Sequence, residues 1–122
     1  MESDLEATVA DLKDIVREFC ENRDWDKYHN AKDLAIGIIT EASELLEFFR
    51  FKDDIEIQTL MNDNEKLKEI SHELADIFYF ILRFSQKYDI DITKAFESKM
   101  KVNEAKYPID KAKGSNKKYN EF

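Results

Sequence analysis

Residues 41–49 read Glu-Ala-Ser-Glu-Leu-Leu-Glu-Phe-Phe, and residues 73–82 read Glu-Leu-Ala-Asp-Ile-Phe-Tyr-Phe-Ile-Leu. Each stretch begins with two acidic residues three positions apart and continues into apolar residues. Residues with this spacing lie on the same side of an α-helix. Two such pairs on two facing helices would place four carboxylates around one point, which is a way to hold a hard divalent cation.

The positions of these acids on a helical wheel of about 100° per residue set them apart from ordinary surface charges. Glu41 and Glu73 fall inside the apolar arcs of their helices, whereas Glu44 and Asp76 fall at the edges of those arcs. Glu47 points away from its arc, toward water. A carboxylate within an apolar arc is unfavourable unless it is paired or bound to a metal. Glu41, Glu44, Glu73 and Asp76 are therefore the candidate metal ligands, and Glu47 is not.

The composition predicts a small helical protein. The chain has 122 residues, 43% of them hydrophobic, with only two Gly and one Pro, so long uninterrupted helices are expected. No signal-peptide pattern or long apolar run occurs, and the lone Cys20 cannot form an internal disulfide. We therefore expect a cytoplasmic protein that does not bind membranes. The net charge of −8 argues against a nucleic-acid polymer as partner.

The apolar periodicity predicts four helices, at residues 4–22, 31–50, 64–88 and 92–105. The expected N-caps are Ser3 or Asp4 for the first helix, Asp63 or Asn64 for the third, and Asp91 for the fourth. Residues 22–30 are predicted to form a loop. The acidic residues 51–64 are predicted to form a connection with at most a short turn. Tyr107-Pro108 should end the last helix and lead into a polar, basic tail over residues 106–122.

These elements indicate an all-α fold, a four-helix bundle formed by one domain over residues 1–122. The two central helices carry more apolar surface than a single short bundle can bury. We therefore expect homo-oligomerisation, as a homodimer or homotetramer, to complete the bundle.

Carboxylate oxygens select hard cations such as Mg²⁺ or Mn²⁺, which can polarise a phosphoryl group and generate hydroxide near neutral pH. The residues thus suggest metal-assisted hydrolysis of a phosphoanhydride in a small molecule. The alternative is that Lys, Arg or Tyr side chains inside the bundle satisfy Glu41 and Glu73. Because the same spacing recurs on two helices, we favour the metal site.

A di-iron site is a second carboxylate alternative. Glu69 and His72 have the Glu-x-x-His spacing that di-iron four-helix proteins use twice, together with two further Glu residues. The chain has only two His, and the other, His29, lies in a predicted loop. The second Glu-x-x-His is therefore missing, which disfavours this alternative.

Further short motifs accompany the acidic pairs. They are Arg23-Asp24-Trp25 with His29, Ser98-Lys99-Met100 with Asn103, Tyr107-Pro108, and Lys113-Gly114-Ser115. With them the chain resembles the all-α nucleoside triphosphate pyrophosphohydrolases of the MazG type. Within that family it most resembles the branch that includes dCTP pyrophosphatases. The resemblance extends from about residue 12 to residue 119.

The resemblance implies that Glu41, Glu44, Glu73 and Asp76 are Mg²⁺ ligands and catalytic groups, with Mn²⁺ as a substitute. It implies hydrolysis of a (deoxy)nucleoside triphosphate between its α and β phosphates, which gives a monophosphate and pyrophosphate. Glu41 or Glu44 could assist as general base. The alternative function is a non-catalytic helical module that binds metal or nucleotide.

The resemblance also suggests substrate contacts. Trp25 and His29 would lie near the base and the phosphates, although Trp25 could simply pack the first loop and His29 could cap the second helix. Lys99 and Asn103, one turn apart, could reach phosphate and base or sugar, or could form a solvated helix face. Lys32 and the tail residues Lys113, Lys117 and Lys118 are phosphate candidates for which surface charge is the simpler interpretation.

Two aromatic positions depart from the dCTP-preferring branch. Phe51 stands where that branch commonly has Trp, which leaves a smaller stacking face, and Phe80 stands where it often has Tyr. Both remain candidate substrate-binding residues. Loss of the Tyr hydroxyl removes a hydrogen bond and relaxes discrimination. A pyrimidine deoxynucleotide is expected as substrate, such as dCTP or a modified form of it.

Overall fold

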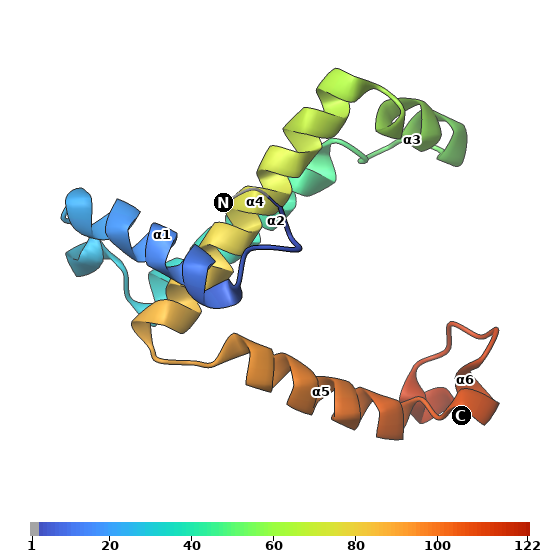
Figure 1. Ribbon diagram of the computed structural model, residues 1–122. Helices are drawn as coiled ribbons and strands as arrows, with labels where there is room; N and C mark the ends of the chain where they lie inside the picture. The colour runs from blue at the N-terminus through green and yellow to red at the C-terminus, as the bar shows by residue number, and fades with distance from the viewer. Residues whose placement is uncertain (1–2) are drawn as a thin grey trace. The chain divides into compact units, whose positions relative to one another are not determined.

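The computed structural model describes residues 3–122 and contains helices and connections but no strand in that range (Figure 1). The described chain divides into two compact units, Met1–Asp89 and Ile90–Phe122. The all-α prediction is confirmed, whereas the assignment to a single domain stays a prediction. Within residues 3–122, none of the helices combines the length and apolar composition that a bilayer-spanning helix requires.

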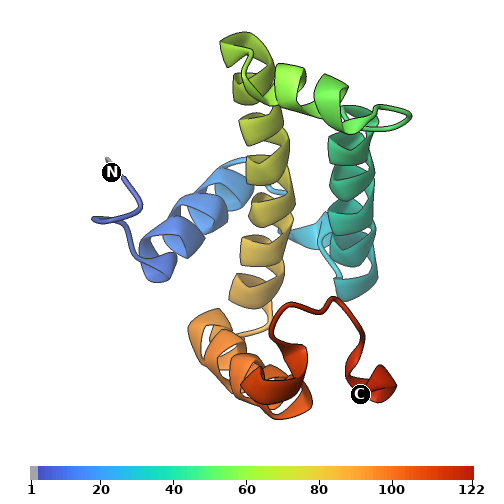
Figure 2. The same cartoon turned by 90° about the vertical axis from the view of Figure 1, so that its right-hand side faces the viewer.

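The first unit is built around α4 (Asn64–Lys87), which contacts α1 (Val9–Asn22), α2 (Ala31–Glu47) and α3 (Asp54–Met61). Figure 2 shows α2 and α4 side by side and α1 on the other side of α4. α4 begins at the predicted cap, because the Asp63 carboxylate accepts hydrogen bonds from the backbone N–H groups of Glu65 and Lys66. The long central helix was thus predicted correctly from its apolar periodicity.

The core of the first unit lies where α1 and α2 meet α4. Its buried apolar side chains are Val16 and Cys20 of α1, Leu34 of α2, and Ile70 and Leu82 of α4. The Cys20 Sγ atom lies 3.1 Å from the hydroxyl oxygen of Tyr79, so the thiol is both buried and hydrogen-bonded. The core therefore anchors the last turn of α1, which leads into the loop between α1 and α2.

The first helix starts later than the sequence indicated. Thr8 and Asp11 form a capping box: the Thr8 hydroxyl oxygen accepts from the Asp11 N–H, and the Asp11 carboxylate accepts from the Thr8 N–H. A capping box satisfies two of the four unpaired donors at a helix start. Leu5, which falls inside the helix predicted at residues 4–22, is 97% exposed. The prediction of a start near Ser3 or Asp4 is therefore wrong.

The segment between α2 and α4 is more helical than predicted. α2 ends at Glu47, three residues before the predicted end, and α3 occupies Asp54–Met61 inside the predicted connection. Asp53 caps α3 through a capping box with Glu56. The helix is two turns long, so its few apolar residues did not form a recognisable stripe.

The second unit contains α5 (Ile92–Lys106), the short α6 (Ile109–Ala112) and a 3-10 turn at Tyr119–Glu121. Asp91 caps α5 as expected, since its carboxylate accepts from the Lys94 N–H. Pro108 follows the last turn of α5, which confirms the predicted end. The predicted tail is folded against itself, because Tyr107 makes edge-on ring contacts with Tyr119 and Phe122.

Candidate functional site

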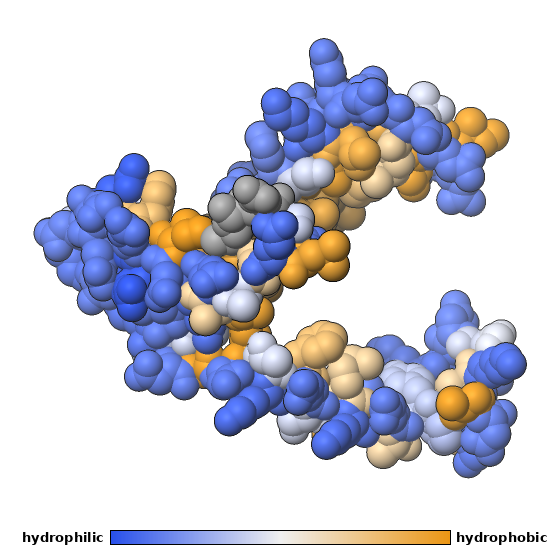
Figure 3. All heavy atoms as spheres, in the orientation of Figure 1, coloured by the Kyte–Doolittle hydropathy of each residue, from blue (hydrophilic) through white to orange (hydrophobic). Residues whose placement is uncertain are grey.

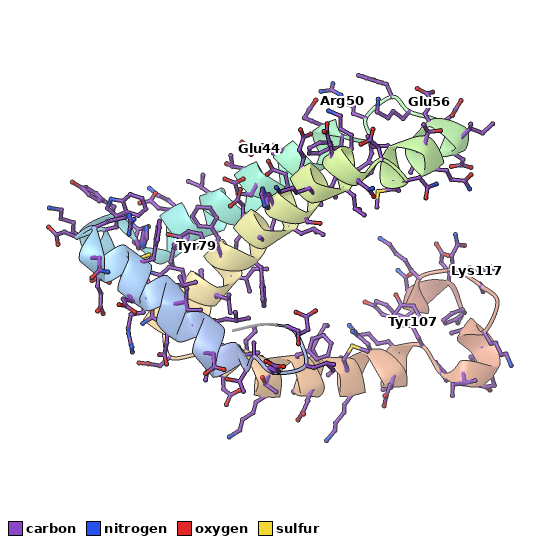
Figure 4. All side chains as sticks on the ribbon, turned by 45° about the horizontal axis from the view of Figure 1, so that its top comes forward. Glu44, Arg50, Glu56, Tyr79, Tyr107 and Lys117 are labelled. Carbon is purple, nitrogen blue, oxygen red and sulfur yellow. The ribbon has the colours of Figure 1, made fainter. Side chains whose placement is uncertain are left out.

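Three of the predicted acids come together between α2 and α4. Glu41 of α2 and Glu73 and Asp76 of α4 each offer one carboxylate oxygen, and these oxygens lie within 4.8 Å of one another. Glu44 follows one turn after Glu41 on α2, and Figure 4 shows it on the α2–α4 pair. Its charge acts on the carboxyl groups of both Glu41 and Glu73. The structure thus brings three of the four acids together and places Glu44 near enough for its charge to act on two of them.

Two oxygen atoms in this cluster have no partner. Glu41 Oε2 and Glu73 Oε2 are shielded from solvent, and neither forms a hydrogen bond in the described part of the chain. No ion pair found among residues 3–122 involves the four acids. The alternative in which Lys, Arg or Tyr satisfies Glu41 and Glu73 is therefore wrong. Buried carboxylate oxygens without partners are unfavourable and indicate a missing ligand.

The pKa values of the clustered acids also indicate that a positively charged ligand is missing. Burial and the neighbouring carboxylates of Glu44, Asp76 and Glu73 raise the pKa of Glu41 from 4.5 to about 7. Burial and the charges of Glu44 and Asp76 also raise the pKa of Glu73. Like charges held this close disfavour joint ionisation. A divalent cation among them would remove the repulsion, and an all-oxygen donor set suits a hard cation of the Mg²⁺ class.

A row of aromatic rings connects the first loop with α4. Its successive contacts have ring centroids 5.0–6.4 Å apart in edge-on geometry, and they run from His29 to Trp25, Phe19, Tyr79 and Phe80. Such contacts contribute about 0.5–1.5 kcal/mol each beyond the area that they bury. Trp25 packs within the first loop, which was the alternative to a substrate contact predicted for it. The row of rings also connects this loop to Phe80.

Phe80 brings the aromatic row next to the acids. It lies one turn after Asp76 on α4, and its ring packs against Gly37, which lies one turn before Glu41 on α2. The predicted substrate residues Trp25, His29 and Phe80 thus belong to one connected set of side chains, whose far end is one helical turn from the carboxylates.

His29 is held by a residue that the sequence did not single out. The Arg83 Nε–H donates to His29 Nδ1 at 2.9 Å, and the Arg83 Nη2 atom donates to Asp26 Oδ1 at 2.8 Å. Arg83 is 1% exposed, although it is an arginine on a helix of a small protein. The available signal was an Arg placed between the apolar Leu82 and Phe84. Asn30, and not His29, caps α2, so that alternative for His29 is wrong.

The remaining predicted substrate residues lie elsewhere. Phe51 follows α2 with 90% of its surface exposed, and the guanidinium of Arg50 lies 4.7 Å from its ring centroid. Lys99 is exposed on α5, and Asn103 is half-buried there with its Nδ2 atom 3.9 Å from Met100 Sδ. α5 belongs to the second unit, so a shared site with the acids stays a prediction for both residues.

The comparisons with known proteins agree on one family. A family model described as the MazG-like family matches residues 36–122. Two dCTP pyrophosphatase 1 proteins, from Rattus norvegicus and Homo sapiens, are 28% and 29% identical over 117 residues, which cover 96% of this chain and 69% of each relative. A crystal structure of a pyrophosphatase from Archaeoglobus fulgidus has a TM-score of 0.75 and 36% identity, covering 81% of this chain and 91% of its own.

Proposed function

Because the chain belongs to the MazG-like family, we propose that it is a nucleoside triphosphate pyrophosphohydrolase that releases a monophosphate and pyrophosphate. The observation that carries this proposal is the pair of shielded, unpartnered oxygens, Glu41 Oε2 and Glu73 Oε2, which belong to carboxylates that approach one another between α2 and α4. A triphosphate is itself highly anionic, so it can approach this acidic point only together with a cation. The same charges therefore favour a cation as cofactor and are compatible with an anionic substrate that binds through it.

The proposed cofactor is Mg²⁺, with Mn²⁺ as a substitute, held by Glu41, Glu44, Glu73 and Asp76. When bound, such a cation polarises a phosphoryl oxygen and lowers the pKa of water. Glu41 and Glu73 supply the shielded oxygens, while Glu44 and Asp76 are the more exposed ligands. A carboxylate of α2, from Glu41 or Glu44, accepts the proton of the attacking water.

The proposed substrate is a pyrimidine deoxynucleoside triphosphate such as dCTP or a modified form, in line with the names of the curated relatives. The Trp25–Phe80 row supplies apolar ring edges against which a base can pack. Phe80 carries no hydroxyl, so it cannot read the base or the sugar by a hydrogen bond. We therefore expect weaker discrimination among pyrimidines than a Tyr at this position would give.

We also propose that the chain self-associates as a dimer or tetramer. Large apolar side chains remain exposed along the two central helices, namely Ile39 and Leu46 on α2 and Leu67, Leu74 and Phe78 on α4. Figure 3 shows apolar surface along the arm formed by α3 and α4. A second copy covering this surface would bury it. Sedimentation of wild type and of a Leu46→Glu, Leu74→Glu double variant tests this: the variant should sediment as a smaller species.

The deciding assay is incubation with a panel of NTPs and dNTPs plus Mg²⁺, with monophosphate and pyrophosphate measured separately. We expect both products from at least one pyrimidine dNTP and none after chelation of the metal. Absence of turnover with every nucleotide would instead favour a non-catalytic binding module. Formation of a diphosphate and orthophosphate would place the cleavage at the wrong bond.

A further inference from the structure

Arg83 uses its guanidinium to join two parts of the first loop to the end of α4. Its Nε–H donates to His29 Nδ1, its Nη2 atom to Asp26 Oδ1 and its Nη1 atom to Gln86 Oε1. Each nitrogen of the guanidinium thus has an acceptor. Burying an arginine is unfavourable unless its donors are satisfied in this way. The arrangement is therefore specific for a guanidinium, which presents its donors in a fixed planar fork.

The contact with His29 determines where the imidazole carries its proton. Arginine stays protonated and has no acceptor, so Nε can only donate. His29 Nδ1 must therefore be the unprotonated nitrogen, and the hydrogen of the neutral ring is on Nε2. Because Arg83 engages Nδ1, Nε2–H is the one donor that the neutral ring can offer to a ligand.

The charges around the ring support the neutral form. Three charged groups face it, the guanidinium of Arg83, the ammonium of Lys87 and the carboxylate of Asp26. Burial, followed by the positive charges of Arg83 and Lys87, lowers the pKa of His29, and Asp26 opposes this effect. The ring therefore keeps one donor and one acceptor through neutral pH.

We propose that Arg83 is a positioning residue that holds His29 as the Nε2–H tautomer, so that the ring donates a hydrogen bond to an oxygen atom of the bound nucleotide. This inference rests on the proposed function, because the ligand is the nucleotide. The other tautomer would present a lone pair to an oxygen acceptor, and the two would repel each other. A purely mechanical clamp for the loop would not depend on the tautomer.

The tautomer is measured by long-range ¹H–¹⁵N correlation spectra of the imidazole rings. The chain has only two His, and the exposed His72 serves as an internal reference in every sample. In the wild type we expect His29 to show a protonated Nε2 and an unprotonated Nδ1 between about pH 6 and 8. Protonation of Nδ1 in that range would overturn the proposal.

Two variants and one matched control separate positioning from clamping. Arg83→Met keeps the volume, and replacement of a buried charged group by an apolar residue of similar size is often tolerated. Arg83→Lys keeps the charge but lacks the planar fork. Lys87→Met is the control, because Lys87 holds the same loop through the carbonyl oxygen and the carboxylate of Asp26 and forms no hydrogen bond with the imidazole among the contacts of residues 3–122. We expect mixed tautomers in both Arg83 variants and the wild-type tautomer in Lys87→Met.

Measurements of KM and kcat then test whether the tautomer of His29 affects nucleotide binding. In Arg83→Met we expect KM for the preferred nucleotide to rise on the order of tenfold, the size of one hydrogen bond to a charged group. kcat should change less, and KM should become pH-dependent near the ordinary pKa of about 6.5 for His. If the Arg83 variants fold and keep the wild-type tautomer, KM and pH profile, the role of Arg83 is overturned, while the proposed function is unaffected. A wild type without turnover would overturn the proposed function, whatever the tautomer.

Discussion

The ring of Phe80 on α4 lies directly against the backbone of Gly37 on α2: a Cβ atom built on the glycine would come within 2.5 Å of the ring atoms Cδ1 and Cε1. Real Cβ atoms do not approach a ring this closely, so the glycine is needed for the observed position of the ring. Because Gly37 lies one turn before Glu41 and Phe80 one turn after Asp76, this contact sets how α2 and α4 meet beside the acids.

Gly37→Ala tests the contact. Alanine is the better helix former by about 1 kcal/mol, but overpacking a close contact is unfavourable by about 1–3 kcal/mol. We expect a net loss of up to about 2 kcal/mol in the free energy of unfolding, measured by urea denaturation. In a Phe80→Leu background the ring atoms Cε1 and Cζ are gone, and the same Gly→Ala change should become neutral or stabilising. If Gly37→Ala changed the free energy of unfolding equally in both backgrounds, the Phe80 ring would not be what requires a glycine at position 37.

Glu73→Gln removes one of the two shielded acids while keeping its shape. The metal-free variant should melt at a higher temperature than wild type, because one of the mutually repelling charges is gone. The increase of the melting temperature on adding Mg²⁺ should disappear. Loss of groups that only orient a ligand reduces activity about 10–100-fold, so loss of a ligand should reduce kcat/KM at least about 100-fold.

Glu47→Gln is the matched control for that substitution. Glu47 lies one turn after Glu44 on the same helix, but it pairs with Arg50 at the surface, 3.3 Å away. We expect this variant to keep the Mg²⁺-dependent melting shift and the activity of the wild type. Unfolding of the Glu73 variant, or an equal loss of activity in the Glu47 variant, would indicate that Glu73 has a structural role instead.

The raised pKa of Glu41, about 7 against an ordinary value of 4.5, predicts the pH dependence of the metal-free protein. Between these two values the folded state binds a proton that the unfolded state has released. The stability that this proton contributes is therefore fully present below about pH 4.5 and is lost as the pH rises through 7. We expect a loss of about 1–2 kcal/mol, less than the whole shift would give, because only one oxygen of Glu41 is shielded and the neighbouring Glu44 and Asp76 are exposed to solvent.

This dependence is measured by thermal unfolding from pH 5 to 8 in the presence of a chelator. Saturating Mg²⁺ should reverse the slope, because protons and the cation compete for the same carboxylates. Glu41→Gln should flatten the slope of the metal-free protein, whereas Glu47→Gln should leave it unchanged. A flat profile in the wild type would mean that Glu41 is ionised in the metal-free fold.

Phe51→Ala tests the proposed stacking role of an exposed ring. Since Phe51 is almost fully exposed, the free energy of unfolding should change by no more than about 0.5 kcal/mol. Stacking of an aromatic ring on a base contributes about 1–3 kcal/mol, so KM should rise about tenfold or more if the ring contacts the nucleotide as the sequence predicts. An unchanged KM would remove Phe51 from the substrate site.

Local features were decided by the sequence alone. The starts of α4 and α5 follow from Asp63 and Asp91, because a helix cap needs only residues within one turn. The spacing of Glu41 from Glu44, and of Glu73 from Asp76, is likewise a property of a single helix. The helical wheel therefore identified the four acids before any contact between α2 and α4 was known.

Only the tertiary structure decided which groups face one another across helices. It showed that Glu41 Oε2 and Glu73 Oε2 have no partner, that Phe80 rests on Gly37, and that Arg83 binds His29. These pairs are far apart in the chain, so their distances depend on how whole helices pack and not on the periodicity of either helix. The sequence alone indicated that four carboxylates would meet, and the packing of α2 against α4 determined which of their oxygens are left for a cation.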